Sequence, residues 1–208
     1  MSTEARPLLR GLALVNDVTV VRALHGDGVL QRFADRLTAP QRAEYDAGFL
    51  PGRWYDEDIQ ARLFAVLAEA FDERALTRIG VGIVKFHVSR TQRFLARIAG
   101  PRRLMQRSAG LWSYWRDTGR LAVEHLEDTG VRVAVLDHPL MASPGYGLIY
   151  GTASAAVVSL SGARQVRVKV QVEHALRVVA DVHWAPHPDS GPGFLSIDDA
   201  LASLPATL

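Results

Sequence analysis

Histidine and carboxylate side chains near the C-terminal end of the chain are the groups whose types and spacing come closest to a metal site. His174 and His183 stand near the carboxylates of Glu173 and Asp181, on two stretches that we expect to form adjacent strands. Imidazole and carboxylate groups are ligands of catalytic zinc, so a pairing across this hairpin would support a metal-assisted hydrolase. The polar face of a strand is more often simply solvated. We therefore expect no metal, zinc included, and keep His174 and His183 as the candidates if one binds.

Nucleophilic and nucleotide-dependent chemistry lacks its sequence patterns. The chain has no cysteine, which excludes disulfides, thiolate zinc sites and cysteine nucleophiles. The serines of segment 154–161 stand outside any G-x-S-x-G elbow. The glycines of segment 145–151 do not follow the strand–turn–helix order of a dinucleotide site. We therefore predict that the chain is not an enzyme.

Basic residues are concentrated in segment 74–116, which carries 10 of them and no acidic residue, within a chain of net charge +2. In one interpretation, folding brings acids such as the 56–58 cluster against these arginines in ordinary surface ion pairs. In the other, the segment faces nucleic acid or an acidic membrane surface. We favour the first, because the segment is also rich in apolar residues and no nucleic-acid-binding motif accompanies it. The second would use Arg90, Arg93, Arg97, Arg102, Arg103 and Arg107.

Small side chains over 146–160 suggest a helix that either leaves room for an apolar ligand or packs closely on a sheet. Both interpretations need the same small residues, so the pattern alone leaves them balanced. A ligand would lie beside the large aromatic residues of the chain. The pocket candidates are Trp112, Trp115, Tyr146, Tyr150 and Ala155.

Length and composition limit the class of protein to which these candidates can belong. The 208 residues, 48% of them hydrophobic, suffice for one compact domain with a real core. No apolar run reaches the roughly 18 residues that would span a bilayer. The start of the chain lacks the pattern of a signal peptide, so we expect a cytoplasmic protein. Among the 24 basic residues only two are lysines, a bias typical of GC-rich bacterial genes.

Helical periodicity dominates the first half. We predict a short strand at 11–15, two short helical pieces around 26–28, a strong helix over about 57–71 and a long helix over about 73–98. Gly100-Pro101 is expected to end the long helix and to start another, over about 101–115. The long helix is predicted to bury one face, made of Leu76, Ile79, Ile83, Phe86, Phe94, Leu95 and Ile98.

After residue 119 the hydrophobic pattern alternates. It predicts a hairpin over about 121–135 and, after the helix at 146–160, strands at 165–174 and 176–184. The fold class is α+β, with N-terminal helices packed on a four-stranded antiparallel sheet and a β-β-α-β-β C-terminal half. We divide the one compact domain into a flexible tail (1–10), a helical portion (11–99), an α+β portion (100–188) and a C-terminal tail with a short helix at 196–204 (189–208).

The run from 100 to 184 resembles the ligand-binding module of the 4-vinyl reductase/haem-NO-binding-associated superfamily, whose fold is shared with TRAPP vesicle-tethering subunits. It looks closest to an uncharacterised myxobacterial branch. The matching stretches are Gly100-Pro101-Arg102-Arg103-Leu104, Leu111-Trp112 with Tyr114-Trp115 and Gly119, the glycines at 145, 147 and 151, and Val182-His183-Trp184. The resemblance implies a sensing or scaffolding module, often dimeric, rather than an enzyme.

Two departures from that superfamily affect the expected cofactor. Relatives of the vinyl-reductase type place cysteines around the last hairpin, and residues 173–184 contain none. Haem-NO-binding proteins hold the haem propionates with Tyr-x-Ser-x-Arg, which Phe86-His87-Val88-Ser89-Arg90 does not match. We therefore expect no cofactor and regard haem, like zinc, as not expected.

The sequence thus predicts a non-catalytic signalling or scaffold module. We expect it to form a homodimer and to bind a protein partner, with a small apolar ligand between helices and sheet. The alternatives are an anion-binding module acting through segment 74–116 and a metal-assisted hydrolase.

Overall fold

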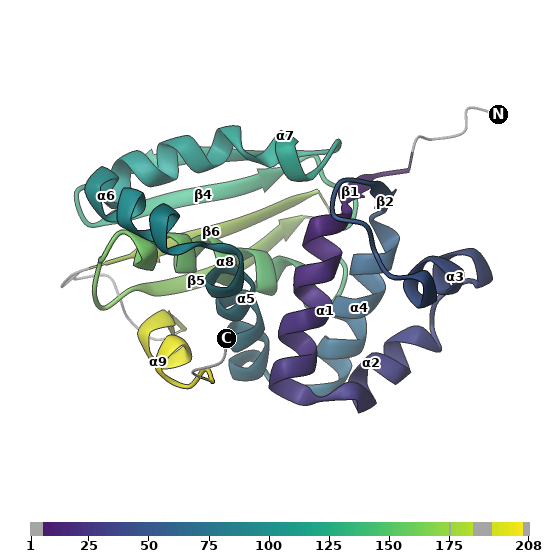
Figure 1. The fold of residues 1–208 in the computed structure, drawn as a ribbon. Coiled ribbons are helices and arrows are strands. Elements are labelled where there is room, and N and C mark those ends of the chain that lie inside the picture. Colours follow the sequence, from purple (N-terminus) through teal and green to yellow (C-terminus); the bar gives the residue numbers. More distant parts are fainter. Residues whose placement is uncertain (1–5, 175, 185–192, 206–208) are drawn as a thin grey trace.

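The computed structural model of the chain describes residues 6–174, 176–184 and 193–205, apart from the side chain of Arg90. Figure 1 shows α1–α4 gathered at one side of the molecule and the main sheet at the other, with α5 and α8 between them. The helices are α1 (Gly11–His25), α2 (Asp27–Ala34), α3 (Ala39–Ala47), α4 (Asp58–Ala70), α5 (Glu73–His87), α6 (Arg90–Gly110), α7 (Trp112–Trp115), α8 (Tyr146–Leu160) and α9 (Ile197–Ala202). The strands are β1 (Leu8–Arg10), β2 (Trp54–Asp56), β3 (Arg120–Leu126), β4 (Gly130–Leu136), β5 (Arg167–His174), β6 (Arg177–His183) and β7 (Leu195–Ser196).

The main sheet has the strand order β3-β4-β6-β5-β7, and its neighbouring strands run antiparallel. The predicted α+β class and the β-β-α-β-β order are confirmed. The two-residue β7 adds a fifth strand beyond the four predicted, because Leu195 and Ser196 pair with the start of β5. Ser196, at the end of β7, is the N-cap of the short helix α9, which lies within the predicted 196–204.

Helix α8 is apolar around most of its circumference because it is buried between the sheet and α5. Gly151 of α8 lies against β5, where an added Cβ would come within 2.4 Å of a methyl group of Val170. Gly80 of α5 lies against α8 in the same way, since a Cβ there would be 2.2 Å from the Thr152 hydroxyl and 2.6 Å from the Ile149 carbonyl. The glycines therefore set how closely α5, α8 and the sheet approach.

The short strand predicted at 11–15 is wrong. These residues form the first turn of α1, and the strand is β1, which pairs with β2. A run of five apolar residues does not distinguish a buried helix from a strand. Gly11 lies against the carbonyl oxygen of Leu50 and the ring of Tyr55, with no space for a Cβ. Of the predicted tails, residues 1–5, 189–192 and 206–208 lie outside the described part of the chain.

The long helix predicted over 73–98 is also wrong. Its predicted buried face is confirmed at Leu76 and Ile79 and is wrong from Phe86 onward. Helix α5 ends at His87, and α6 begins after Ser89, whose side chain and that of Gln92 form a capping box. Gly100, at φ 72°, kinks α6 at the position where we expected a helix to end. Four of the predicted core residues are exposed: Phe86 at the end of α5, by 40%, and Phe94, Leu95 and Ile98 after the new helix start, by 63%, 57% and 67%.

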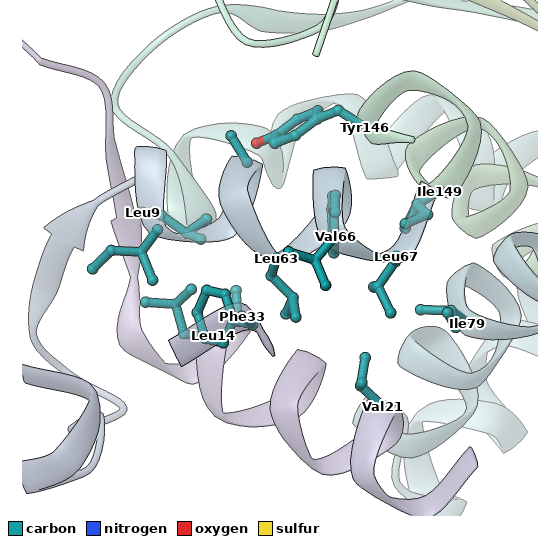
Figure 2. Close-up of a cluster of buried hydrophobic side chains, with 14 of the residues drawn as sticks. Leu9, Leu14, Val21, Phe33, Leu63, Val66, Leu67, Ile79, Tyr146 and Ile149 are labelled. Atoms are coloured by element: carbon teal, nitrogen blue, oxygen red, sulfur yellow. The ribbon is translucent and has the colours of Figure 1, made fainter. Parts of the chain in front are cut away.

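The core between the helices is continuous with the sheet. Figure 2 shows side chains of α4 at the centre of a buried cluster, with α1 on one side and α5 and α8 on another. The labelled members include Leu63, Val66 and Leu67 of α4, Leu14 and Val21 of α1, Ile79 of α5, and Tyr146 and Ile149 of α8. A second cluster lies between α8, α9 and the sheet. Within the described residues, no helix has both the length and the apolar character that crossing a membrane requires.

Candidate functional site

A buried ion pair joins the helical side of the molecule to the chain that enters the sheet. Glu57 immediately precedes α4 and is fully buried, and Arg116 immediately follows α7 with 5% of its side chain exposed. The Arg116 Nε donates to Glu57 Oε1 at 2.7 Å, and its Nη2 donates to Gln60 Oε1 at 3.0 Å. Because both charges are removed from water, each depends on the other for its partner.

His138 and two tyrosines of α8 add three further donors, two of them to Glu57 and one to Gln60. His138, at the end of β4, lies with Nε2 3.0 Å from Glu57 Oε2, and the backbone N–H of Leu140 donates to its Nδ1. This assigns the imidazole proton to Nε2, which donates to Glu57. The Tyr146 hydroxyl donates to Glu57 Oε1, and the Tyr150 hydroxyl donates to Gln60 Oε1 at 2.7 Å. Residues from α4, α7, β4 and α8 thus meet at one carboxylate.

Asp17 of α1 extends the same network. Its carboxylate accepts a hydrogen bond from Gln60 Nε2 and is buried. Burial raises the pKa of Asp17 to about 7, against the opposing effects of the Gln60 hydrogen bond and the Arg116 charge. For Glu57, burial also acts to raise the pKa, yet Arg116, His138 and Tyr146 together hold it below its ordinary value. The two carboxyl groups are therefore driven to different protonation states.

Aromatic rings surround the guanidinium group. The Arg116 Cζ lies 4.3 Å from the ring centre of Tyr150 and 4.8 Å from that of Trp112, within cation–π range. The rings of Tyr146 and Tyr150 are 4.8 Å apart, and Trp112 meets His138 edge-on at 5.8 Å. We call the group made of Asp17, Glu57, Gln60, Arg116, His138, Tyr146 and Tyr150 the junction cluster.

A separate, half-buried histidine stands at the end of α5. His87 Nδ1 lies 2.5 Å from the carbonyl oxygen of Ile83, so Nδ1 carries the proton and Nε2 carries the lone pair. The side-chain amide of Asn16 contacts that Nε2, and the ring of Trp115 meets the imidazole edge-on at 5.5 Å. Burial lowers the pKa of His87, against the effect of the Ile83 hydrogen bond, so the ring is neutral at pH 7.

The predicted pocket residues fall in three places. Trp112, Tyr146 and Tyr150 come together around the junction cluster, where both tyrosine hydroxyls are bound by Glu57 or Gln60. Trp115 lies apart from them, beside the α5 histidine. Ala155 is fully buried in the second core cluster, between α8 and the sheet.

The sequence analysis missed the charged centre of this site. Glu57 was assigned to a surface acid cluster and Arg116 to a basic segment, and nothing in the sequence marks either as buried. Gln60 and His138 carried no signal at all. Asp17, however, stands with Asn16 inside an otherwise apolar helix, and that break in the pattern was an available sign of a buried polar contact.

The predicted surface pairing of the basic segment is largely absent from the described structure. The acid cluster separates on folding, as Asp56 pairs with Arg6, Asp58 with Arg62, and only Glu57 reaches the segment. Three of the anion-binding candidates are exposed on α6 and have no ion-pair partner within the described residues: Arg97, Arg103 and Arg107.

The other anion-binding candidates have partners or fall outside the description. Arg102 lies 3.5 Å from Asp128, and both side chains are exposed. The Arg93 Nε donates to the carbonyl oxygen of Val88 at 3.1 Å. The side chain of Arg90 lies outside the described part of the structure.

The histidine pairing considered for a metal site is wrong. In the register of β5 and β6, His174 is opposite Arg177 and His183 is opposite Arg167, so the two histidines stand at opposite ends of the hairpin. Among the described residues, no group of three or more His, Asp or Glu side chains is arranged to hold a metal ion. A hydrolase using these two histidines on one ion has no geometric support.

Comparison with known proteins gives a match at the level of the fold. No protein-family model and no curated protein matches the chain. The crystal structure of the Fe(II) unliganded H-NOX protein from K. algicida matches with a TM-score of 0.62 and 9% identity, over 88% of this chain and 100% of that one. The chain has the fold of an H-NOX domain.

Two further H-NOX structures match the fold of this chain. One, from work on heme distortion in the H-NOX family, has a TM-score of 0.57 and 14% identity, and covers 88% of this chain and 99% of that one. Another, from work on H-NOX activation, has a TM-score of 0.52 and 17% identity, and covers 86% and 97%. The predicted resemblance to haem-NO-binding proteins is confirmed at the level of the fold, while its 4-vinyl reductase and myxobacterial parts stay predictions.

These matches correct one expectation from the sequence. We regarded haem as not expected, because the residues at 86–90 do not spell the haem signature. The solved structures that share this fold include heme and Fe(II) proteins, so the fold is one that accommodates haem and the expectation is wrong.

Proposed function

We propose that the chain is a non-catalytic sensor module, in which a small ligand bound between the helices and the sheet changes how the two are held together. The observation that carries this proposal is the junction cluster. It joins residues at the ends of α7 and β4 and on α8 to the buried Glu57 carboxylate before α4, and Gln60 extends the network to Asp17 of α1, inside a fold shared with H-NOX proteins. A ligand that displaced one member would act on every element at once.

The residues of the junction cluster suit a two-state response. Glu57 accepts from Arg116, His138 and Tyr146, so moving α8 or the end of β4 removes a donor from a buried charge. Such a loss is costly unless another partner takes its place, which favours discrete arrangements over gradual ones. A ligand then shifts the population between arrangements by its difference in affinity for them. The aromatic residues around the cluster, Trp112, Tyr146 and Tyr150, with Trp115 and Ala155 further along, are the pocket candidates.

Haem is the ligand to test first, and His87 is the residue whose chemistry fits it. Its Nδ1 is anchored to the Ile83 carbonyl and its Nε2 is unprotonated, the tautomer in which imidazole binds a metal. Burial keeps the ring neutral, as a ligand must be. The Asn16 amide contacts that nitrogen and would have to turn aside. A haem iron on His87 would supply an open coordination position for a diatomic gas.

Haem binding is tested on the full chain, produced with a haem precursor in the medium and separately titrated with hemin. We expect a Soret absorbance band from the bound form. His87→Ala should abolish the band, and added imidazole should restore it by replacing the missing side chain. His25→Ala is the matched control, because His25 also ends a helix, is partly buried and has its pKa lowered by burial.

The outcomes separate the cofactor from the sensor role. A Soret band that survives His87→Ala would show that another residue binds the iron. Absence of the band both after growth with the haem precursor and after hemin titration would exclude haem. Native mass spectrometry beside the denatured sample then decides the wider proposal. An extra mass lost on denaturation supports a bound small ligand of another kind, whereas a ligand-free chain under both conditions contradicts a tightly held one.

The same mass spectrum tests the assembly that we propose. We infer that the module acts as a homodimer that contacts a protein partner, as the resemblance to the vinyl-reductase and TRAPP families implies. A dimer mass supports the proposed homodimer, and a monomer mass at all concentrations contradicts it. Localisation in the bacterial cytoplasm belongs to the same proposal.

A further inference from the structure

Large apolar side chains are exposed in one stretch of the chain. Nine of them are exposed among the described residues, and six of these lie between positions 86 and 114. The six are Phe86, Phe94, Leu95, Ile98, Leu111 and Tyr114. Single exposed apolar residues need no explanation, but exposed apolar residues that adjoin one another on a surface mark a contact site. Phe94, Leu95 and Ile98, on the first half of α6, are the ones close enough to adjoin.

The first half of α6 presents its apolar residues together. Phe94, Leu95 and Ile98 are spaced i, i+1 and i+4, so they share one side of the helix, with exposed fractions of 63%, 57% and 67%. The opposite side is anchored in the molecule, because Ala96 and, beyond the kink, Met105 are buried. The apolar residues therefore face outward on a helix that is fixed in place.

Cations without partners accompany these residues. Segment 74–116 contains no acidic residue. On α6, Arg97, Arg103 and Arg107 are exposed and have no ion-pair partner within the described residues, and Arg102 has only the exposed Asp128 at 3.5 Å. We call Phe94, Leu95, Ile98, Arg97, Arg103 and Arg107 the α6 outer surface. Its apolar residues and Arg97 lie on the first half of α6, and Arg103 and Arg107 follow beyond the kink at Gly100, so the surface combines exposed apolar groups with exposed arginines from both halves of the helix.

We propose that the α6 outer surface docks on the surface of an anionic lipid bilayer. A helix with arginines beside Phe, Leu and Ile lies in the plane of the bilayer interface, where lipid phosphates accept the guanidinium groups and the acyl boundary takes the apolar ones. This interaction goes beyond the proposed sensor role and rests on different residues.

Two other partners fit the surface less well. Nucleic acid offers phosphates but stacks only on aromatic rings, and Leu95 and Ile98 would stay in water. A second copy of the chain, related by a two-fold axis, would bring this cationic surface against itself, and like charges facing each other oppose association. An anionic bilayer satisfies both the charged and the apolar residues.

The test is flotation of the purified full chain with vesicles. We expect binding to vesicles of phosphatidylcholine mixed with phosphatidylglycerol and much weaker binding to phosphatidylcholine alone. Binding should fall between about 0.1 M and about 1 M salt, as the screening length shortens from roughly 10 Å to 3 Å.

Variants on the α6 outer surface separate the contribution of its arginines to vesicle binding from that of its apolar residues. Arg103→Gln with Arg107→Gln should weaken binding about twentyfold or more, since each arginine near an anionic surface strengthens it about fivefold. Phe94→Gln with Ile98→Gln should weaken it by about tenfold or more. The matched controls lie elsewhere on the surface: Leu50→Gln, at a residue 61% exposed, and Arg32→Gln should bind as the wild type does.

Each remaining outcome overturns the proposal. Wild-type protein that stays unbound with anionic vesicles rejects it directly, and so do α6 variants that bind as tightly as the controls. Salt-sensitive binding to duplex DNA without vesicle binding assigns the arginines to nucleic acid. A dimer that Phe94→Gln with Ile98→Gln dissociates, again without vesicle binding, assigns the surface to self-association.

Discussion

Arginines of the same acid-free segment have opposite environments in the junction cluster and on the α6 outer surface. Arg116 is 5% exposed, pairs with Glu57 and Gln60, and lies against two aromatic rings. Arg107, only nine positions earlier, is exposed and has no ion-pair partner within the described residues. The difference teaches that a run of like charges has no single role, because neighbouring arginines of one segment can end in the core or on the surface.

The largest effect should come from breaking the buried pair. Arg116→Met leaves Glu57 charged, buried and short of its main partner, which should lower the free energy of unfolding by about 3–5 kcal/mol. Arg107→Met, the matched change on the outer surface, should alter it by less than about 0.5 kcal/mol. Urea denaturation measures both.

Arg116→Lys keeps the comparison measurable if the methionine variant does not fold. Lysine retains the charge but lacks the planar fork that reaches Glu57 and Gln60 together, so its loss of stability should be smaller than that of Arg116→Met. Equal stabilities for the Arg116→Lys and Arg107→Met variants would show that the buried pair is not a special feature of the fold.

A pH-dependent effect should come from Asp17 in the junction cluster. Burial raises its pKa to about 7, so the folded chain binds a proton that the unfolded chain has released. The stability from this group is complete below pH about 4 and is lost as the pH rises through about 7. Asp17→Asn should therefore gain about 2–4 kcal/mol on the wild type between pH 4 and pH 8.

Parallel unfolding curves of the two proteins at several pH values measure this difference. The comparison with Asp17→Asn cancels the contributions of Glu57 and the other titrating groups that both proteins share. A constant difference from pH 4 to pH 8 would mean that Asp17 is ionised throughout and that its partners, not burial, decide its state.

The smallest effect should come from the outer surface. Ile98→Gln replaces an apolar side chain that is 67% exposed, so the free energy of unfolding should change by less than about 0.5 kcal/mol. Ile79→Gln, at a fully buried isoleucine of α5, should destabilise the protein by several times as much. A large loss at Ile98 would show that the first half of α6 is packed and not free to dock.

Strong periodic patterns predicted much of the fold. The alternation around β3 and β4 and over β5 and β6 predicted both hairpins, because a half-buried antiparallel strand needs that alternation. The stripe over 57–71 predicted α4 almost residue by residue. The small residues of α8 predicted a helix but left close packing and room for a ligand balanced, and the contacts of Gly80 and Gly151 show close packing at those two positions.

Weaker patterns failed for identifiable reasons. The apolar run at 11–15 suited a strand and a helix equally well, and contact with residues 50 and 55 decided for a helix. The periodicity from 73 to 98 ran through a break, since Ser89 and Gln92 form a cap that starts a new helix. The sequence contains that Ser-x-x-Gln cap, but the hydrophobic residues on both sides of it follow one helical period, which hides the break.

The sequence by itself determined the class of the fold, the β-β-α-β-β order along the C-terminal half and the absence of acidic residues from segment 74–116. These follow from local preference and composition, which act over a few neighbouring residues. Tertiary structure alone decided that Glu57 meets Arg116, 59 positions away, while Arg97, Arg103 and Arg107 have no acidic partner in the part of the chain that the structure describes. The physical reason is that burial and ion pairing depend on which distant segments pack together, and a charged residue has the same identity in the sequence whether it becomes buried or stays in water.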